Sequence, residues 1–101
     1  MDKFGIPNST IDLINKLFAS IKEINEVKLF GSRAKGNFKT GSDIDFAITG
    51  DIEEKLLRHI ASELDELPTP YKFDVINYND IDNLALKQNI DNDGIIFYTK
   101  N

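Results

Sequence analysis

Residues 43–49, which read DIDFAIT, alternate strictly between large apolar side chains and acidic or small ones. A strand places successive side chains on opposite faces, so this segment predicts one apolar face and one acidic face. The apolar face holds Ile44, Phe46 and Ile48, and the opposite face holds Asp43, Asp45, Ala47 and Thr49. Such a strand must bury one face and can leave the other open. The chain is therefore constrained to a sheet that is packed on one side.

Helical and strand periodicities follow one another along the rest of the chain. Helices are expected over 9–23, where Ser9 and Asp12 resemble a capping pair, from Asp51 to the stop at Pro68 and Pro70, and from a cap at Asn79 or Asp80 through about 88. Strands are expected over 27–30, 43–49, 71–77 and 95–98, with a turn over 92–94. A loop over 32–41 has room for one helical turn after Ser32. The order α-β-β-α-β-α-β predicts an α/β (α+β) fold, a small mixed sheet flanked by helices.

Size, charge and composition limit the classes of protein to consider. We expect 101 residues to form one domain, 1–101, and a net charge of −5 argues against a general nucleic-acid binder. Arg33, Lys35 and Lys39 still form a local basic patch. The sequence has no cysteine, which excludes disulfides, thiolate metal sites and cysteine nucleophiles. Without an apolar signal or a segment long enough to span a bilayer, we expect a soluble, cytoplasmic protein that does not contact membranes.

Three aspartates interrupt apolar strands. Asp43 and Asp45 lie on one face, with Cα atoms about 7 Å apart along the strand. Asp74 interrupts a later strand between Phe73 and Val75. Each acid alone is more simply a solvated strand residue, but three acids on one small sheet suit Mg²⁺, which prefers carboxylate and phosphate oxygens.

A Gly-Ser pair ends the first expected strand. Gly31 permits a tight turn and a close approach to the backbone, and Ser32 offers a hydroxyl beside amides that can face a phosphate. The sequence lacks both GxxxxGK[ST] and a GxGxxG between a strand and a long helix. A Gly-Ser turn is common, so this pair has weight only in combination with the acids.

Together these residues resemble the nucleotidyltransferase superfamily that includes DNA polymerase beta and kanamycin nucleotidyltransferase. The superfamily pattern is an apolar residue, Gly, Gly or Ser, a gap, and then Asp-apolar-[Asp/Glu]-apolar. Here it reads Phe30-Gly31-Ser32, ten intervening residues, and then 43–46 as DIDF. The size and the stretch GSRAKG…SDIDFAI are similar to the minimal nucleotidyltransferases, known as MNT proteins. The resemblance covers most of the chain.

The resemblance implies a role for each matching residue. Members transfer a nucleoside monophosphate from an NTP, here expected to be ATP, and release pyrophosphate. Asp43 and Asp45 would hold two Mg²⁺ ions, with Mn²⁺ as an alternative, and Asp74 would complete the catalytic and metal site. Gly31 and Ser32 would hold the triphosphate. Arg33, Ser42 and Lys35 are further candidates for nucleotide contact, although a loop charge or a turn residue explains each of them equally well.

The acceptor is inferred from the same resemblance. MNT proteins commonly pair with a small helical HEPN protein as a toxin–antitoxin system, so we expect transfer of AMP to a hydroxyl of such a partner. The alternative is a non-catalytic module that neutralises or assembles with a HEPN-like partner. Modification of a small molecule such as an aminoglycoside and nucleic-acid polymerisation are less favoured, because no acceptor or template domain is evident. A homo- or hetero-oligomer is left open.

Two other residue types have competing interpretations. His59 is the only histidine, and its place beside the apolar stripe of the second helix indicates a surface residue rather than a catalytic base. Tyr71, Tyr78 and Tyr98 can stack on a base, but packing on the strands is the simpler use.

Overall fold

The computed structural model describes residues 4–39 and 41–100. The elements follow in the order α1 (Asn8–Ala19), β1 (Ile24–Phe30), α2 (Ser32–Lys35), β2 (Ile44–Gly50), α3 (Glu54–Asp65), β3 (Phe73–Asn77), the 3-10 helix η1 (Tyr78–Asp80), α4 (Leu84–Asp93) and β4 (Ile95–Thr99). The predicted order is confirmed, and the predicted helical turn after Ser32 is α2. The 3-10 helix was not predicted.

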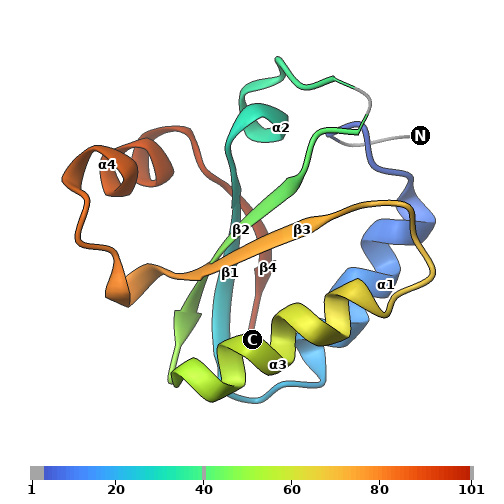
Figure 1. Ribbon diagram of the computed structural model, residues 1–101, viewed down its shortest axis with the longest axis horizontal. Coiled ribbons are helices and arrows are strands. Elements are labelled where there is room, and N and C mark those ends of the chain that lie inside the picture. Colours follow the sequence, from blue (N-terminus) through green and yellow to red (C-terminus); the bar gives the residue numbers. More distant parts are fainter. Residues whose placement is uncertain (1–3, 40, 101) are drawn as a thin grey trace.

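The four strands form one mixed sheet in the order β3-β2-β1-β4. Strand β1 is antiparallel to both β2 and β4, and β2 is parallel to β3. Helix α3 links the two parallel strands, because a parallel pair needs a crossover connection. In Figure 1, α1 and α3 lie together at the lower right, whereas α4 lies at the left. The sheet is therefore packed heavily on the side of α1 and α3.

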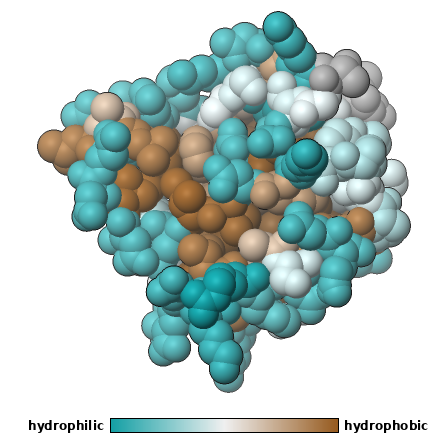
Figure 2. All heavy atoms as spheres, viewed as in Figure 1, coloured by the Kyte–Doolittle hydropathy of each residue, from teal (hydrophilic) through white to brown (hydrophobic). Residues whose placement is uncertain are grey.

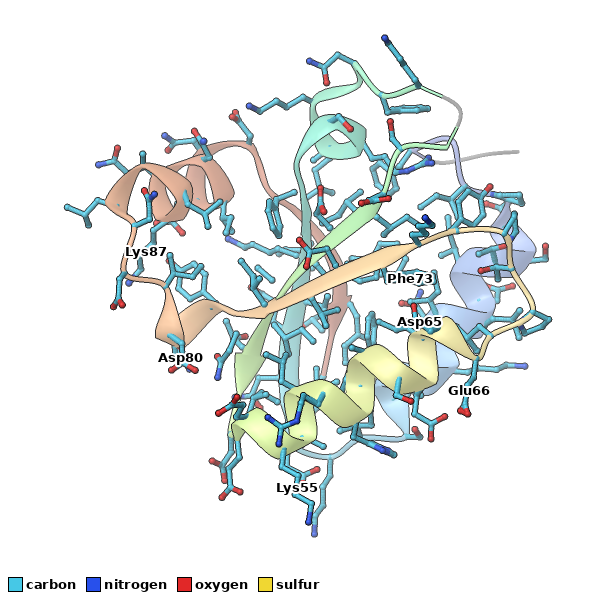
Figure 3. The ribbon with its side chains drawn as sticks, in the orientation of Figure 1. Lys55, Asp65, Glu66, Phe73, Asp80 and Lys87 are labelled. Carbon is cyan, nitrogen blue, oxygen red and sulfur yellow. The ribbon has the colours of Figure 1, made fainter. Side chains whose placement is uncertain are left out.

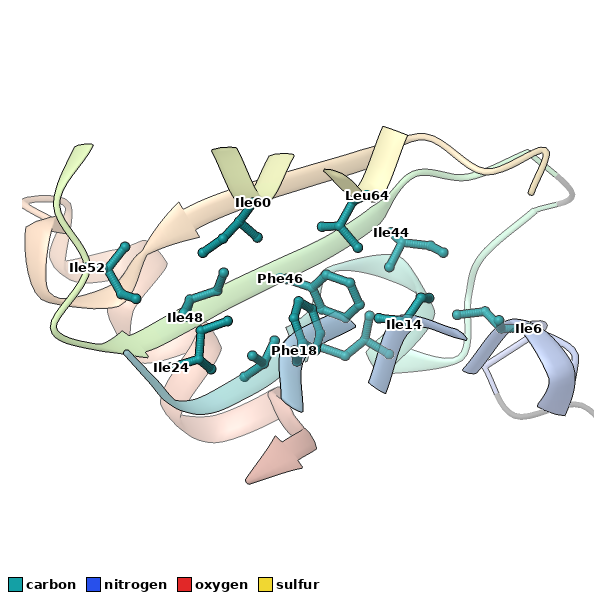
Figure 4. Close-up of a cluster of buried hydrophobic side chains, with 12 residues drawn as sticks. Ile6, Ile14, Phe18, Ile24, Ile44, Phe46, Ile48, Ile52, Ile60 and Leu64 are labelled. Atoms are coloured by element: carbon teal, nitrogen blue, oxygen red, sulfur yellow. The ribbon is translucent and has the colours of Figure 1, made fainter. Parts of the chain in front are cut away.

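The hydrophobic core fills the space between the sheet and these two helices. Phe18 of α1 meets Phe46 of β2 edge to face, with ring centroids 5.3 Å apart, and Phe46 meets Phe97 of β4 at 4.9 Å. Ile60 and Leu64 of α3 cover the same strand from the other helix (Figure 4). Burying each such side chain contributes about 1.5–3 kcal/mol. The predicted apolar face of β2 is confirmed, since Ile44, Phe46 and Ile48 are fully buried.

Helix α1 starts without the predicted capping pair of Ser9 and Asp12. The N-cap is Pro7, and no side chain caps the helix. The Pro7 carbonyl accepts the amides of Thr10 and Ile11 at 3.0 Å each. Proline supplies an extended backbone before the first turn, so this start is set by backbone geometry rather than by a side-chain cap.

The same helix ends at Ala19, four residues before the predicted end. The Ser20 hydroxyl donates to the Leu17 carbonyl at 2.6 Å, which satisfies one of the last helical acceptors. Ile24, the last residue of the apparent helical stripe, opens β1 and is fully buried. Its burial serves the sheet instead of the helix.

Helix α3 begins at Glu54 rather than at the predicted Asp51. Ile52 precedes it and inserts into the core with 8% of its surface exposed. The Ile52 carbonyl accepts the Asn77 side-chain amide at 2.8 Å, a buried hydrogen bond. Because this hydrogen bond and the burial of Ile52 hold the segment before Glu54 extended, the helix starts later than predicted.

The predicted helix from Asn79 or Asp80 is wrong at its start. Those residues form η1, which begins where the Asn77 side chain accepts the Asn79 amide at 3.1 Å. Helix α4 is capped instead by Asn83, whose side chain accepts the Leu86 amide at 3.1 Å. It runs to 93, so two residues of the predicted turn over 92–94 are helical.

Strand ends differ from the predictions by one to three residues. Strand β1 starts at Ile24 rather than 27, β2 covers Ile44–Gly50 rather than 43–49, and β3 starts at Phe73 rather than 71. Strand β4 extends to Thr99. Within the described residues, every helix is too short or too polar to cross a bilayer.

Candidate functional site

Three aspartates share the face of the sheet opposite the main core. In the parallel register of β2 and β3, Asp45 lies directly opposite Asp74. Paired positions on adjacent strands are separated by about 4.8 Å. Asp43 stands two residues before Asp45, just ahead of β2, and side chains two apart share a face. The structure therefore brings the three sequence-predicted acids to one end of the strand pair.

The surroundings of Asp45 disfavour its negative charge. Partial burial raises the pKa of the Asp45 carboxyl above its ordinary value of 3.8, and the carboxylates of Asp74 and Asp43 raise it further. Asp43 and Asp74 are themselves exposed. A cation placed among the three acids would offset this repulsion.

Gly31 is fitted against one of these acids. Its φ of +80° lies in the left-handed region, which favours glycine. A Cβ built on Gly31 would collide with Oδ2 of Asp45. The absence of a side chain therefore lets the carboxylate lie against the backbone of the turn. Ser32 follows as the first residue of α2, so the predicted Gly-Ser turn and acidic pair belong to one site.

The Arg33 guanidinium forms its hydrogen bonds with backbone carbonyl groups. Only 3% of its surface is exposed, and it donates through Nε and one terminal nitrogen to the Ser42 carbonyl, at 3.1 and 2.8 Å. Its other terminal nitrogen donates to the Phe4 carbonyl at 2.8 Å. The guanidinium also lies 5.1 Å from the ring centroid of Phe38 and 5.2 Å from that of Tyr71. Among the described residues Arg33 forms no ion pair with an acid, and it ties the loop before β2 to the N-terminal segment.

Ser42 directly precedes Asp43, and Lys35 ends the short helix α2 that follows Gly31. The Ser42 hydroxyl accepts the Lys39 amide at 2.9 Å, which closes the loop immediately before Asp43. Lys35 Nζ lies 3.9 Å from a carboxylate oxygen of Asp93 on α4, with both side chains roughly half exposed. Exposed pairs of this kind contribute little stability, so the lysine can exchange partners readily.

The three carboxylates are suitable ligands for a divalent cation, but they are not already arranged around a metal position. Over 4–39 and 41–100, no three acidic or histidine side chains are close enough to form a preassembled metal cluster. Mg²⁺ is commonly bound by one or two carboxylates together with substrate phosphates and water, rather than by an all-protein cage. The exposed carboxylates of Asp43 and Asp74 beside the repelled Asp45 match that mode of binding.

Charged residues elsewhere lie outside the site. His59 is exposed on α3 and lies 3.5 Å from Glu63 one turn later, which confirms it as a surface residue. Lys55 extends outward from the same helix, and Glu66 does so from the C-cap position that follows it (Figure 3). They form the solvated face of α3.

An apolar groove lies along the edge strand β3, beyond Asp74. Val75 and Ile76, the residues after Asp74, line a cavity of about 310 Å³ together with residues of α3, η1 and α4. The remaining lining residues are Leu57, Asn77, Asp80, Ile81, Asp82, Asn83 and Leu86. Leu84, at the start of α4, is 72% exposed. Apolar side chains gather over α4 and β3 at the left and centre of Figure 2.

Residues 12–101 match the family described as "Polymerase beta, Nucleotidyltransferase". Among solved structures, the chain is similar to a toxin–antitoxin structure with AMP-PNP, at a TM-score of 0.63 and 21% identity over 94% of this chain and 75% of the other. A Shewanella oneidensis structure, the tri-AMPylated HEPN toxin in complex with MNT antitoxin, has a TM-score of 0.61 and 21% identity over 92% of this chain and 72% of the other. The toxin–antitoxin MntA–HepT structure has a TM-score of 0.60 and 21% identity over 93% of this chain and 74% of the other. No curated protein sequence matches. These structural matches confirm the expected fold.

Proposed function

The chain belongs to the polymerase beta nucleotidyltransferase family, and we propose from this that it transfers AMP from ATP to a hydroxyl group of a protein. The observation that carries the proposal is that Asp43, Asp45 and Asp74 share one open face and that Gly31 packs against the central acid. If the acids were only solvated surface residues, there would be no reason for a turn glycine to leave space for the Asp45 carboxylate.

Each acid has a proposed part in the reaction. Asp43 and Asp45 would hold two Mg²⁺ ions, with Mn²⁺ as an alternative, and Asp74 would complete the set. Bound there, the ions would neutralise charge on the phosphates and on the attacking and leaving oxygens. The residual charge of three carboxylates and two divalent ions is about +1, which attracts an anionic nucleotide.

The proposed transfer is a single in-line displacement. The acceptor oxygen forms a bond to the α-phosphorus, the bond between the α-phosphorus and the bridging oxygen breaks, and pyrophosphate leaves with that oxygen. Asp74, the exposed acid at the edge strand, would take the hydroxyl proton. Gly31 and Ser32 would hold the departing phosphates. No covalent protein intermediate is needed, because positioning and charge neutralisation carry phosphoryl-type transfers.

The surroundings of Arg33 and Ser42 support a different role from nucleotide contact. We propose that they act as positioning residues: the buried guanidinium holds the Ser42 carbonyl, and Ser42 directly precedes Asp43. Lys35 remains the better candidate for contact with phosphate, because its ammonium group is only loosely paired.

We propose a HEPN-type protein as the acceptor, with the chain acting as the antitoxin of a toxin–antitoxin pair. The support is the fold shared with structures of such complexes, one of them containing an AMPylated HEPN toxin. The apolar groove beside Asp74 offers a protein acceptor a place to dock close to the acids. We also propose that the protein acts in the cytoplasm, alone or in an oligomer, without binding nucleic acid or membranes.

The test is transfer of label from α-³²P-ATP to a purified HEPN-type protein with Mg²⁺. We expect label on the HEPN protein and its loss with Asp43→Asn, Asp45→Asn and Asp74→Asn, with Glu66→Gln as an exposed control. Stable complex formation with no transfer, unchanged by the three substitutions, would instead establish the non-catalytic binding module.

A further inference from the structure

The acidic face of the sheet continues beyond the three aspartates. In the antiparallel register of β1 and β2, Asp45 lies opposite Phe30, Ala47 opposite Lys28, and Thr49 opposite Glu26. Side chains two residues apart share a face, so Ala47 and Thr49 follow Asp45 along the same side of β2. Ala47 stands about 7 Å beyond Asp45 along the strand.

A small cavity lies over this continuation. Its volume is about 130 Å³, and it is lined by Glu26, Lys28, Ala47, Thr49, Tyr78 and Asp91. Tyr78 comes from η1 and Asp91 from α4, and the two are joined by a hydrogen bond of 2.6 Å from the tyrosine hydroxyl to the carboxylate. Figure 3 shows η1, which carries Asp80, next to α4, which carries Lys87. These two elements cover one end of a sheet face that stays open at the acids.

We propose that this cavity receives the base of the nucleoside triphosphate and selects bases that carry an amino group. The proposal rests on the proposed function, because it needs the phosphates to lie at Gly31 and the three aspartates. With the α-phosphate there, the ribose and base must extend away from the acids. In one direction lies the loop before β2, where Ser42 is occupied by Lys39 and Arg33. In the other direction lies the cavity above Ala47.

The lining of the cavity determines which base edges fit. The cavity presents two carboxylates, Glu26 and Asp91, and one ammonium group, Lys28. The carboxylates are acceptors only, so they favour an amino donor such as N6 of adenine or N4 of cytosine. Uracil would present a carbonyl oxygen where the carboxylates lie, and Lys28 alone could donate to it. The hydrogen bond to Asp91 raises the pKa of the Tyr78 phenol above its ordinary value of 10.0, so the hydroxyl is a donor to Asp91 at neutral pH. Ala47 forms the floor, and its short side chain leaves the space open.

The experiment compares the affinities of ATP, UTP and tripolyphosphate by isothermal titration calorimetry with Mg²⁺ present. Ala47→Leu fills the cavity, Asp91→Asn changes its charge on the exposed side, and Ala85→Leu on the outside of α4 is the matched control. We expect Ala47→Leu to lower the affinity for ATP by roughly tenfold or more while the affinity for tripolyphosphate changes little. We expect Asp91→Asn to reduce the ratio of ATP affinity to UTP affinity by a similar factor. The control should behave as the unsubstituted chain does.

The outcomes separate this inference from the proposed function. If ATP and tripolyphosphate both bind the unsubstituted chain, and Ala47→Leu and Asp91→Asn alter neither the ATP affinity nor the ratio of ATP to UTP, the base lies elsewhere and the inference is wrong. If the unsubstituted chain binds no nucleotide with Mg²⁺, the proposed function fails as well. Should Ala47→Leu fail to fold, as judged by circular dichroism, the surface substitution Asp91→Asn decides the question alone.

Discussion

Asp45 and Asp74 face each other as a register pair across the parallel strands β2 and β3. Like charges directly opposite each other in a sheet are destabilising. In this sheet the unfavourable electrostatic effect falls mainly on Asp45, because burial first and then its two acidic neighbours raise the pKa of its carboxyl. A chain selected for stability alone would avoid this pair, so the pair is best explained as a functional requirement.

Replacing Asp45 by Asn should therefore stabilise the metal-free protein at neutral pH while removing activity. We expect a rise of a few degrees in the midpoint of thermal unfolding, kept small because the carboxyl is partly solvated. Because the folded-state pKa of Asp45 lies above its unfolded value of 3.8, the stabilisation from its protonation is full below 3.8 and is lost as the pH rises through the folded-state pKa.

The measurement is thermal unfolding by circular dichroism with EDTA at several pH values. The stability gain from Asp45→Asn should become smaller as the pH falls toward 3.8, and Asp12→Asn, at an exposed position inside α1, should show no such gain. A neutral-pH loss of stability in Asp45→Asn would contradict the account of the site as a repulsive cluster. Addition of Mg²⁺ with ATP should raise the midpoint of the unsubstituted protein more than that of the variant.

Gly31→Ala should show whether the contact between Gly31 and the Asp45 carboxylate matters for activity, apart from the cost of placing alanine at positive φ. Alanine at positive φ costs about 1–2 kcal/mol. Gly36→Ala is the control for positive φ, because Gly36 has a φ of +83° with no atom within 4 Å of an added Cβ. Gly31→Ala should lose more stability than Gly36→Ala in urea unfolding, because Gly31 has a ψ of −156°, a region used almost only by glycine, whereas Gly36 is in the αL region. Only Gly31→Ala displaces the Asp45 carboxylate, and we expect its transfer rate to fall by about 100-fold. Equal rates in the two variants would show that the fit between Gly31 and Asp45 is incidental.

The fold could be predicted largely because its strongest pattern is strictly periodic. The alternation over 43–49 specifies which side of β2 is buried, and a slip of one residue would bury Asp45 in the core. Element ends were less predictable, because local hydrogen bonds decide them. The Asn77 side chain serves both Ile52 and Asn79, two contacts that no periodicity of the sequence contains.

The resemblance to the nucleotidyltransferases is confirmed by the family match, whereas the roles of individual site residues stay predictions. The grouping of the acids followed from strand geometry. The contacts of Arg33 could not be predicted, because they join Phe4 to Ser42 across distant parts of the chain. The cavity beside Ala47 was missed for the same reason: Ala47 and Thr49 were placed on the acidic face, but no sequence signal brings Tyr78 and Asp91 over them.

Arg33→Lys should affect stability more than nucleotide affinity. Lysine keeps the charge but lacks the planar fork that serves the Ser42 and Phe4 carbonyls together. Breaking these buried contacts should cost about 2–4 kcal/mol, measured by urea unfolding, while Lys35→Arg should change little. ATP affinity measured at low temperature, where the variant is folded, should fall only modestly. If Arg33→Lys left the free energy of unfolding unchanged but abolished ATP binding, Arg33 would contact the nucleotide directly.

Leu84→Asp should impair transfer to a protein acceptor without impairing ATP binding. Leu84 is 72% exposed at the start of α4 beside the apolar groove, so its replacement should leave the free energy of unfolding nearly unchanged. An apolar contact at the centre of a protein interface is commonly worth more than 1 kcal/mol, so we expect the acceptor's KM to rise by roughly tenfold. Ile96→Asp is the matched control, because Ile96 is 57% exposed on the opposite edge strand, outside the groove. Steady-state transfer to a purified HEPN-type protein, with ATP affinity measured in parallel, gives both quantities. Equal effects of the two substitutions on the acceptor's KM would mean that the groove beside Asp74 does not receive the acceptor.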